Sequence, residues 1–249
     1  MLILITNDDG INAPGLQALA DVFGELGEVV VVAPALEQSG KGHAITMHDP
    51  LRPRLLKEGW WSVDGTPSDC VYVGIHSVLK RKPDLLVSGI NRGPNLGDDL
   101  TYSGTVGAAI EGTIQGVLSL AVSLVSYKPE GYTLAARAAL HVARKMQDYD
   151  FPPRMFLNLN VPVQLKDGKM QLKITRQGKR NYNQSVIERT DPRGHTYVWI
   201  GGDAMGMEVT NGGDIDAVNE GYVSLTPVQI DLTCDELIDP LKAWENEID

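Results

Sequence analysis

The chain has 249 residues, of which 43% are hydrophobic and 22% charged, a composition typical of a folded globular protein rather than a disordered one. Its net charge of -10 at pH 7 and its pI near 4.9 argue against a nucleic-acid-coating surface and against a basic membrane contact. An anionic substrate would need local positive charge from a metal ion, from helix N-termini or from a few basic side chains.

The cysteines and the start of the chain indicate a cytoplasmic protein. Only Cys70 and Cys234 occur and neither belongs to a CxxC motif, so we expect neither a zinc site nor a disulfide framework. The apolar start at residues 1–5 is too short for a signal peptide and lacks basic residues before it. No apolar run is long enough to span a membrane.

Strand and helix patterns alternate along the first 165 residues. Buried strands are expected at residues 2–7, 29–33, 84–90, 119–125 and 155–159. Amphipathic helices are expected at residues 14–26, 66–79, 106–117 and 131–147. This alternation predicts an α/β fold in three layers, with a Rossmann-like, doubly wound and mostly parallel sheet.

The pattern of alternating strands and helices ends in the remaining residues, 166–249, which we do not expect to form an independent domain. Runs rich in β-forming residues at 185–190 and 195–200 flank the turn 191–194 and predict a β-hairpin. A strand is expected at 221–228 and a short terminal helix at 240–248. Two strands alone are marginally stable in water. The hairpin therefore packs either on its own domain or on a second subunit, and we favour the second.

The first predicted strand ends in two adjacent carboxylates, Asp8 and Asp9. The carboxyl edge of a parallel sheet is where ligands bind in open α/β folds. Two neighbouring anions repel each other unless a cation lies between them or water screens them. On its own, this pair fits both a metal site and a solvated acidic turn.

Three further segments are expected at the same edge of the sheet. The second strand leads to Ser39, Gly40 and His43, and the third leads to Asn91 and Asn95 in a glycine-rich loop. Residues 103–105, Ser-Gly-Thr, open the next helix and offer amide N–H groups to an anion. Each segment also has a plain structural explanation: a glycine-rich turn, an N-cap, or a hydrogen-bonded loop histidine.

Together, these motifs resemble those of the SurE family, the stationary-phase survival proteins, which are metal-dependent 5′-nucleotidases. The resemblance covers residues 1 to about 230 in order. It rests on the segments Leu4-Ile5-Thr6-Asn7-Asp8-Asp9-Gly10, Ser39-Gly40, Ser88-Gly89-Ile90-Asn91-Arg92-Gly93-Pro94-Asn95, Tyr102-Ser103-Gly104-Thr105-Val106 and Gly221-Tyr222-Val223-Ser224-Leu225-Thr226-Pro227.

The resemblance implies a ligand set and a phosphate site. The metal ligands would be Asp8, Asp9, Ser39 and Asn91, and the phosphate contacts would be Gly40, Asn95, Ser103, Gly104 and Thr105. Oxygen donors without a soft ligand suit one Mg²⁺ or Mn²⁺ ion per subunit. Asp8 and Asp9 would be the catalytic pair, with either Asp8 or a water at the metal supplying the nucleophile. His43 is a candidate for substrate contact.

The expected reaction is hydrolysis of nucleoside 5′-monophosphates, with 3′-monophosphates and polyphosphate as further candidates. One alternative is a nucleotide-binding regulatory module with little turnover, which would bind tightly and release no phosphate. A dinucleotide oxidoreductase fits poorly, because the first strand ends in Asn-Asp-Asp-Gly rather than GxGxxG. The family implies a homodimer or homotetramer.

Overall fold

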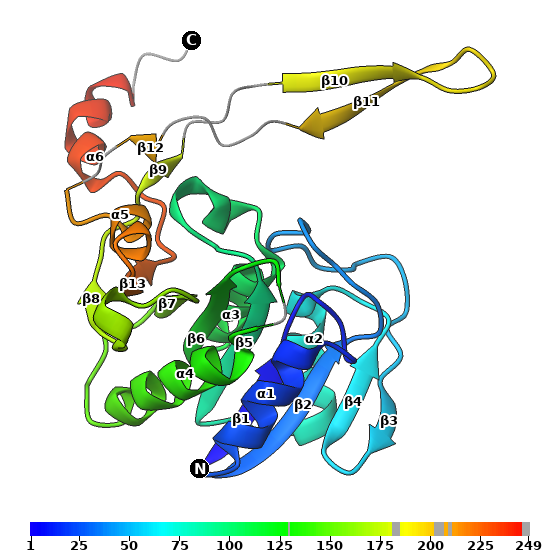
Figure 1. The fold of residues 1–249 in the computed structure, drawn as a ribbon, viewed down its shortest axis with the longest axis vertical. Helices are drawn as coiled ribbons and strands as arrows, with labels where there is room; N and C mark the ends of the chain where they lie inside the picture. The colour runs from blue at the N-terminus through cyan, green and yellow to red at the C-terminus, as the bar shows by residue number, and fades with distance from the viewer. Residues whose placement is uncertain (129, 181–184, 202–206, 209–210, 246–249) are drawn as a thin grey trace.

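A nine-stranded sheet forms the centre of the computed structural model, which describes residues 1–128, 130–180, 185–201, 207–208 and 211–245 (Figure 1). In spatial order the strands are β3 (Arg54–Lys57), β4 (Trp60–Val63), β2 (Glu28–Pro34), β1 (Leu2–Thr6), β5 (Leu85–Arg92), β6 (Leu118–Val125), β7 (Met155–Pro162), β13 (Val223–Gln229) and β8 (Leu172–Ile174). Neighbouring strands run parallel except at β3–β4 and β7–β13, which are antiparallel.

Helices cover both faces of this sheet and complete the three layers. One face carries α1 (Pro14–Phe23) and α4 (Tyr132–Met146), which pack against each other (Figure 1). The opposite face carries α2 (Pro67–Val73), its π-helical continuation at Gly74–Leu79, and α3 (Gly104–Ile114). The predicted three-layer α/β arrangement with a mostly parallel sheet is therefore confirmed, and its two antiparallel pairs are β3–β4 and β7–β13.

The side chains of β1 alternate between these two helix layers, as the two-residue repeat of a strand requires. Ile3 and Ile5 belong to the core that includes α1 and α4. Leu2 and Leu4 belong to the smaller core that includes α2. All four are buried, so the alternation of β1 also determines toward which helix layer the side chains just after the strand point.

The sequence patterns missed the two strands at the β3–β4 edge. The side chains of β3 are all exposed, so the strand has no apolar alternation to reveal it. In β4, Trp60 and Trp61 are half-buried, while Ser62 and Val63 are buried against β2. An edge strand with one covered face gives a weaker signal than the buried runs of β1, β2 and β5.

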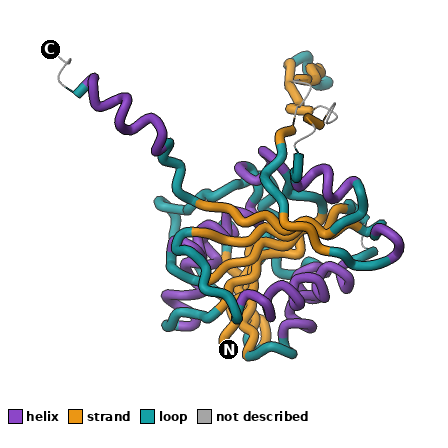
Figure 2. Tube along the Cα trace, turned by 90° about the vertical axis from the view of Figure 1, so that its left-hand side faces the viewer, coloured by secondary structure: helices purple, strands orange, loops and turns teal. Residues whose placement is uncertain are grey.

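The C-terminal part contributes both to the main sheet and to a separate hairpin. β13 and β8 extend the main sheet, while α5 (Asp214–Asn219) packs beside β13. The predicted hairpin is present as β10 (Ser185–Thr190) and β11 (Thr196–Gly201), paired antiparallel. It projects from the body of the molecule, as does the helical segment at residues 235–245 (Figures 1 and 2). A second pair of short strands joins β9 (Lys179–Arg180) to β12 (Met207–Glu208).

The prediction for the terminal helix is wrong at its start. The helix α6 covers Asp235–Leu241 and continues as a 3-10 turn at Lys242–Trp244, whereas residues 246–248 of the prediction lie outside the described part. Pro240 lies inside the helix rather than at its first position. The acidic residues Asp235 and Glu236 occupy the first turn, where negative charge favours a helix N-terminus.

Asp214, at the start of α5, fixes the loop that follows β5. Its side chain is fully buried and accepts hydrogen bonds from the amides of Gly97, Gly178 and Ile215, at 2.8–2.9 Å. Burial raises the pKa of this carboxyl, although the three amide hydrogen bonds oppose the shift. The C-terminal part is thereby tied to the Asn95 loop at the candidate site.

Two further observations concern the cysteines and the helices. Cys70 is buried and Cys234 exposed, and both are free thiols. Within the ranges given above, none of the helices combines the length and apolar character that crossing a membrane requires.

Candidate functional site

The predicted site residues lie where the order of the strands reverses. From β1 the chain moves to β2 on one side and then to β5 on the other, so the carboxyl end of β1 lies at a topological switch point. Crevices at such points are the usual ligand sites of open α/β sheets. Asp8 and Asp9 follow β1 at this position.

Asp8 points toward α3 and contacts the start of that helix directly. Its side chain is only 3% exposed, and the Thr105 hydroxyl donates a hydrogen bond to Oδ1 of Asp8. Gly104 leaves room for this approach, since a Cβ there would lie 2.8 Å from the Cβ of Asp8. Ser103 caps the helix: its Oγ accepts from the amide of Val106 at 3.2 Å.

Asp9 points toward the opposite helix layer. Its Oδ2 accepts from the amide of Arg92 at 3.1 Å, and it lines a cavity with Pro14 of α1 and Tyr132 of α4. The alternation seen along β1 thus continues past the end of the strand. The two carboxylates share one edge of the sheet but face different layers.

Both carboxylates have raised pKa values. Burial raises the pKa of Asp8, and the hydrogen bond from Thr105 only partly offsets that effect. For Asp9, burial and then the neighbouring charge of Asp8 raise the pKa to about 6. Removal from water and like-charge repulsion both disfavour the ionised form. A cation bound between the two side chains would oppose both effects.

The two neutral donors of the predicted ligand set have oxygen atoms suited to a hard cation. Asn91 donates its side-chain amide to the carbonyl of Gly93 at 3.0 Å, which orients its Oδ1 away from that contact. Ser39 donates its hydroxyl to Glu37 Oε1 at 2.9 Å and keeps its lone pairs for another partner.

Backbone contacts bring the segments that carry these donors to the two carboxylates. The amide of Gln38 donates to the carbonyl of Asp8 at 2.7 Å, and Asn91 precedes the residue that bonds Asp9. Across the described residues, no group of three or more His, Cys, Asp or Glu side chains forms a metal-binding cluster. Two carboxylates supplemented by neutral oxygens fit Mg²⁺ or Mn²⁺ better than zinc.

Asn95, another of the predicted phosphate contacts, is held in place by a network of hydrogen bonds. It is buried, and its side-chain nitrogen donates to Ser123 Oγ on β6 at 2.8 Å. Its backbone carbonyl accepts from Asn158 and Asn160 of β7, and its amide donates to Asn160 Oδ1, each at 2.9 Å. This network fixes the loop after β5 to the two neighbouring strands.

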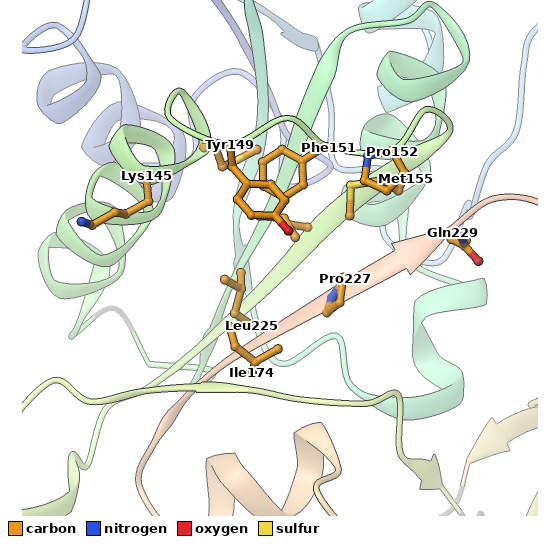
Figure 3. A pocket seen from close by; sticks show the side chains of 11 residues that line it. Lys145, Tyr149, Phe151, Pro152, Met155, Ile174, Leu225, Pro227 and Gln229 are labelled. Atoms are coloured by element: carbon orange, nitrogen blue, oxygen red, sulfur yellow. The ribbon is translucent and has the colours of Figure 1, made fainter.

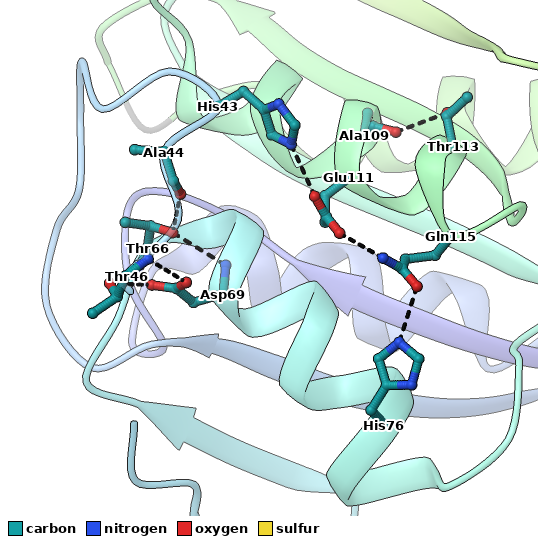
Figure 4. A network of polar contacts seen from close by, with 10 residues as sticks. All are labelled: His43, Ala44, Thr46, Thr66, Asp69, His76, Ala109, Glu111, Thr113 and Gln115. Carbon is teal, nitrogen blue, oxygen red and sulfur yellow. Dashed lines mark hydrogen bonds and ion pairs between the residues drawn. The ribbon is translucent and has the colours of Figure 1, made fainter. Parts of the chain in front are cut away.

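The loop that carries Ser39 and Gly40 is fastened at several points. Gly40 has a φ of +73°, which favours glycine, and a Cβ there would meet no atom within 4 Å. His43 Nε2 lies 2.9 Å from Glu111 Oε2 in the middle of α3 (Figure 4). Thr46 bonds Asp69 at the start of α2, through its amide at 2.9 Å and its hydroxyl at 2.6 Å.

Glu111 is a residue that sequence reasoning missed. It is 3% exposed and bridges His43 to Gln115, which in turn contacts His76 (Figure 4). Burial favours the neutral form of Glu111, but the hydrogen bonds from His43 and Gln115 lower its pKa overall. A glutamate among Gly107, Ala108, Ala109 and Gly112 is the available signal, because an unpaired charge is rarely buried.

The contact with Glu111 also defines what His43 can offer to a substrate. Since Nε2 is held by the carboxylate, a substrate contact by His43 would come from Nδ1. Among the hydrogen bonds of the described residues, none joins His43 to Asp8 or Asp9.

Comparisons with known proteins give a consistent match over nearly the whole chain. A family model described as "Survival protein SurE" matches residues 3–184. The protein named 5′-nucleotidase SurE from Syntrophotalea carbinolica is 50% identical, over 98% of this chain and 97% of its own length. Its namesake from Geotalea daltonii is 49% identical over 98% and 99%.

A solved structure agrees with the fold as well as with the sequence. The crystal structure of the SurE protein from Aquifex aeolicus superposes with a TM-score of 0.89 and 40% identity. The match covers 99% of this chain and 100% of that one. The similarity therefore includes the C-terminal part beyond the range of the family model.

Proposed function

Because the chain belongs to the SurE family, we propose that it is a 5′-nucleotidase, which hydrolyses nucleoside 5′-monophosphates to a nucleoside and phosphate. The observation that carries this proposal is the contact between Asp8 and the start of α3. It places a carboxylate suited to a cation against a helix N-terminus suited to an anion. A phosphate ester bound at this place could meet a cation on one side and helix amides on the other.

We assign Asp8, Asp9, Ser39 and Asn91 as the residues that would hold one Mg²⁺ or Mn²⁺ ion. Their oxygen donors and the orientation of the Asn91 and Ser39 side chains support this assignment. When bound, the cation supplies positive charge that stabilises the phosphate oxygens as negative charge accumulates in the transition state.

The remaining phosphate oxygens are assigned to the start of α3. The first amides of a helix have no carbonyl partner within it, so the Gly104 amide is available to an anion. The hydroxyl of Ser103 accepts from Val106 and keeps its own hydrogen for a phosphate oxygen. The hydroxyl of Thr105 already donates to Asp8, so the role assigned to Thr105 is to orient that carboxylate.

Asn95 and Gly40 complete the proposed phosphate site. A 180° rotation of the Asn95 amide would preserve its contact with Ser123, whose hydroxyl donates as well as accepts, and would present Nδ2 to phosphate. The open space above Gly40 leaves its backbone accessible to a ligand. The attacking oxygen comes either from the Asp8 carboxylate or from water, and trapping a phosphoenzyme distinguishes these routes.

Removal of divalent metal tests the proposed function. Treatment of the protein with EDTA should reduce phosphate release from AMP by about a hundredfold or more, because the cation is expected to supply several kcal/mol of transition-state stabilisation. Addition of excess Mn²⁺ or Mg²⁺ should restore the activity. Equal rates with and without chelator would contradict the metal role. Tight AMP binding without phosphate release would indicate a regulatory module instead.

We also infer that the protein forms a homodimer or homotetramer through its hairpin and C-terminal helix. Pairing places Val186 with Ile200 on one face of the hairpin, and Ile187 with Trp199 on the other. All four side chains are exposed, with Ile200 reaching 96%. Two strands with apolar side chains on both faces need a partner to be stable. Exposed Leu237 and Trp244 in the C-terminal helical region support the same inference.

Light scattering should report twice or four times the 27.1 kDa of the chain. Replacement of both Trp199 and Ile200 by Glu places a charge on each face of the hairpin and should reduce the mass. Ile114→Glu, on the exposed end of α3, provides a matched control that should leave the mass unchanged. A monomeric wild-type protein would refute the inference.

A further inference from the structure

A cavity of about 310 Å³ opens beside Asp9, on the face of the sheet opposite Asp8. Its walls include Pro14, Glu37, Arg92, Tyr127 and Tyr132. We propose that this cavity binds the nucleoside part of the substrate, with the aromatic base stacked on Tyr127. The inference rests on the proposed function and identifies the part of the site that selects nucleotides among phosphate esters.

The position of the cavity follows from the direction of the two carboxylates. Asp8 faces the start of α3, where the phosphate site is proposed, while Asp9 lines the cavity. A phosphate held at the metal ligands would therefore have its ester group directed past Asp9 into this space. The amide of Arg92 fixes Asp9 at the junction between the two compartments, with a hydrogen bond of 3.1 Å.

Tyr127 has the properties of a stacking platform. Its side chain is 74% exposed, which is unusual for a ring held close to the backbone of another segment. The ring packs over Gly93, where an added Cβ would lie only 2.7 Å from the ring. One part of the ring is thus held by the loop after β5, and the exposed part is free to stack on a base. Stacking on tyrosine accepts any base.

The other walls offer polar groups for a sugar and a planar group for the base. Tyr132 lines the cavity, and its phenolic hydroxyl can donate to a ribose oxygen. Glu37 can accept from a ribose hydroxyl, while the same carboxylate receives the Ser39 hydrogen bond at 2.9 Å. The guanidinium of Arg92 is exposed and planar, which suits stacking on an aromatic ring.

The charge of the cavity favours a nucleoside over a chain of phosphates. Asp9 and Glu37 bring two carboxylates to a space with one arginine. A neutral base and sugar would meet no repulsion there, whereas a second or third phosphate group would lie close to two anions. The aromatic and acidic character of the walls therefore points to the same class of ligand.

The test compares two substrates that differ only in whether they carry an aromatic base. Tyr127→Ala should lower kcat/KM for AMP by about tenfold, the lower range of what loss of one stacked base costs. The same variant should change kcat/KM for ribose 5-phosphate by less than about twofold, because this substrate has the sugar and the phosphate but no base. Tyr127→Phe should restore the AMP value, since it keeps the ring.

Tyr149→Ala provides the matched control. Tyr149 is also an exposed tyrosine, at 66%, but it follows α4 and lines a separate apolar cavity with Phe151 and Leu225 (Figure 3). This control should leave both substrates unaffected. Equal losses with both substrates in Tyr127→Ala, or no loss with AMP, would overturn the nucleoside cavity while the proposed hydrolysis stands.

A different outcome would bear on the proposed function itself. If the wild-type protein with Mn²⁺ releases no phosphate from either substrate, the proposed hydrolysis is refuted. Calorimetric titration with AMP then tests the cavity independently of turnover. About tenfold weaker binding by Tyr127→Ala than by Tyr127→Phe would support the cavity, and equal binding would overturn it.

Discussion

Asp8→Asn is expected to lower the turnover of AMP by about a thousandfold, comparable to the largest losses seen when one preorganised electrostatic contact is removed. The amide keeps the volume of the buried side chain and can still bond Thr105, but it removes one negative charge from the proposed ligand set. Phosphate release at saturating Mn²⁺, with calorimetric Mn²⁺ titration, measures the effect.

The folded stability of this variant separates a functional loss from misfolding. Asp8 is buried, and an uncompensated buried charge is unfavourable, so the metal-free variant should melt no lower than the metal-free wild type. Mn²⁺ should raise the melting temperature of the wild type and have little effect on the variant. Asp21→Asn, on the exposed side of α1, is the control and should retain full activity. A fully active Asp8→Asn protein would eliminate the proposed metal site.

Asn91→Ala is expected to weaken Mn²⁺ binding by about tenfold to a hundredfold, at least the loss that even outer-shell changes cause at metal sites. The hydrogen bond from its side-chain amide to the Gly93 carbonyl orients the oxygen that we assign to the metal, and alanine provides neither group. Because the defect is one of affinity, a higher Mn²⁺ concentration should recover part of the lost rate. Calorimetry and a metal-dependent rate profile measure these two effects.

A matched substitution controls for general damage by loss of an asparagine. Asn211→Ala changes an exposed residue beside α5, far along the chain from the ligand set, and should alter neither affinity nor rate. An unchanged Mn²⁺ affinity in Asn91→Ala would remove this residue from the ligand set and leave Asp8, Asp9 and Ser39.

The sequence was most informative about the buried centre of the fold. β1, β2 and β5 are continuous apolar runs between helices with clear amphipathic faces, so their type and their order along the chain could be predicted. The direction of β13 could not, because an antiparallel strand beside β7 has the same local pattern as a parallel one. Pairing partners are properties of the tertiary structure, and no local signal encodes them.

The candidate site could be predicted in part for a related reason. Residues at the carboxyl ends of parallel strands share one edge, so the proximity of Asp8 to the start of α3 followed from topology. The sequence did not indicate that Glu111 would hold His43, or that Asn95 would be enclosed by Ser123 and residues of β7. Those contacts depend on side-chain directions that only the packed structure defines.

The opposite directions of Asp8 and Asp9 separate two kinds of evolutionary change. The start of α3, beside Asp8, is assigned to the phosphate, whereas residues of α1, α4 and the loop after β6 surround the cavity beside Asp9. Substitutions at positions such as Tyr127 can therefore alter which ester is accepted while the bond-breaking apparatus stays intact. Members of the family could therefore differ in the ester that they accept while keeping the residues assigned to the metal and to the phosphate.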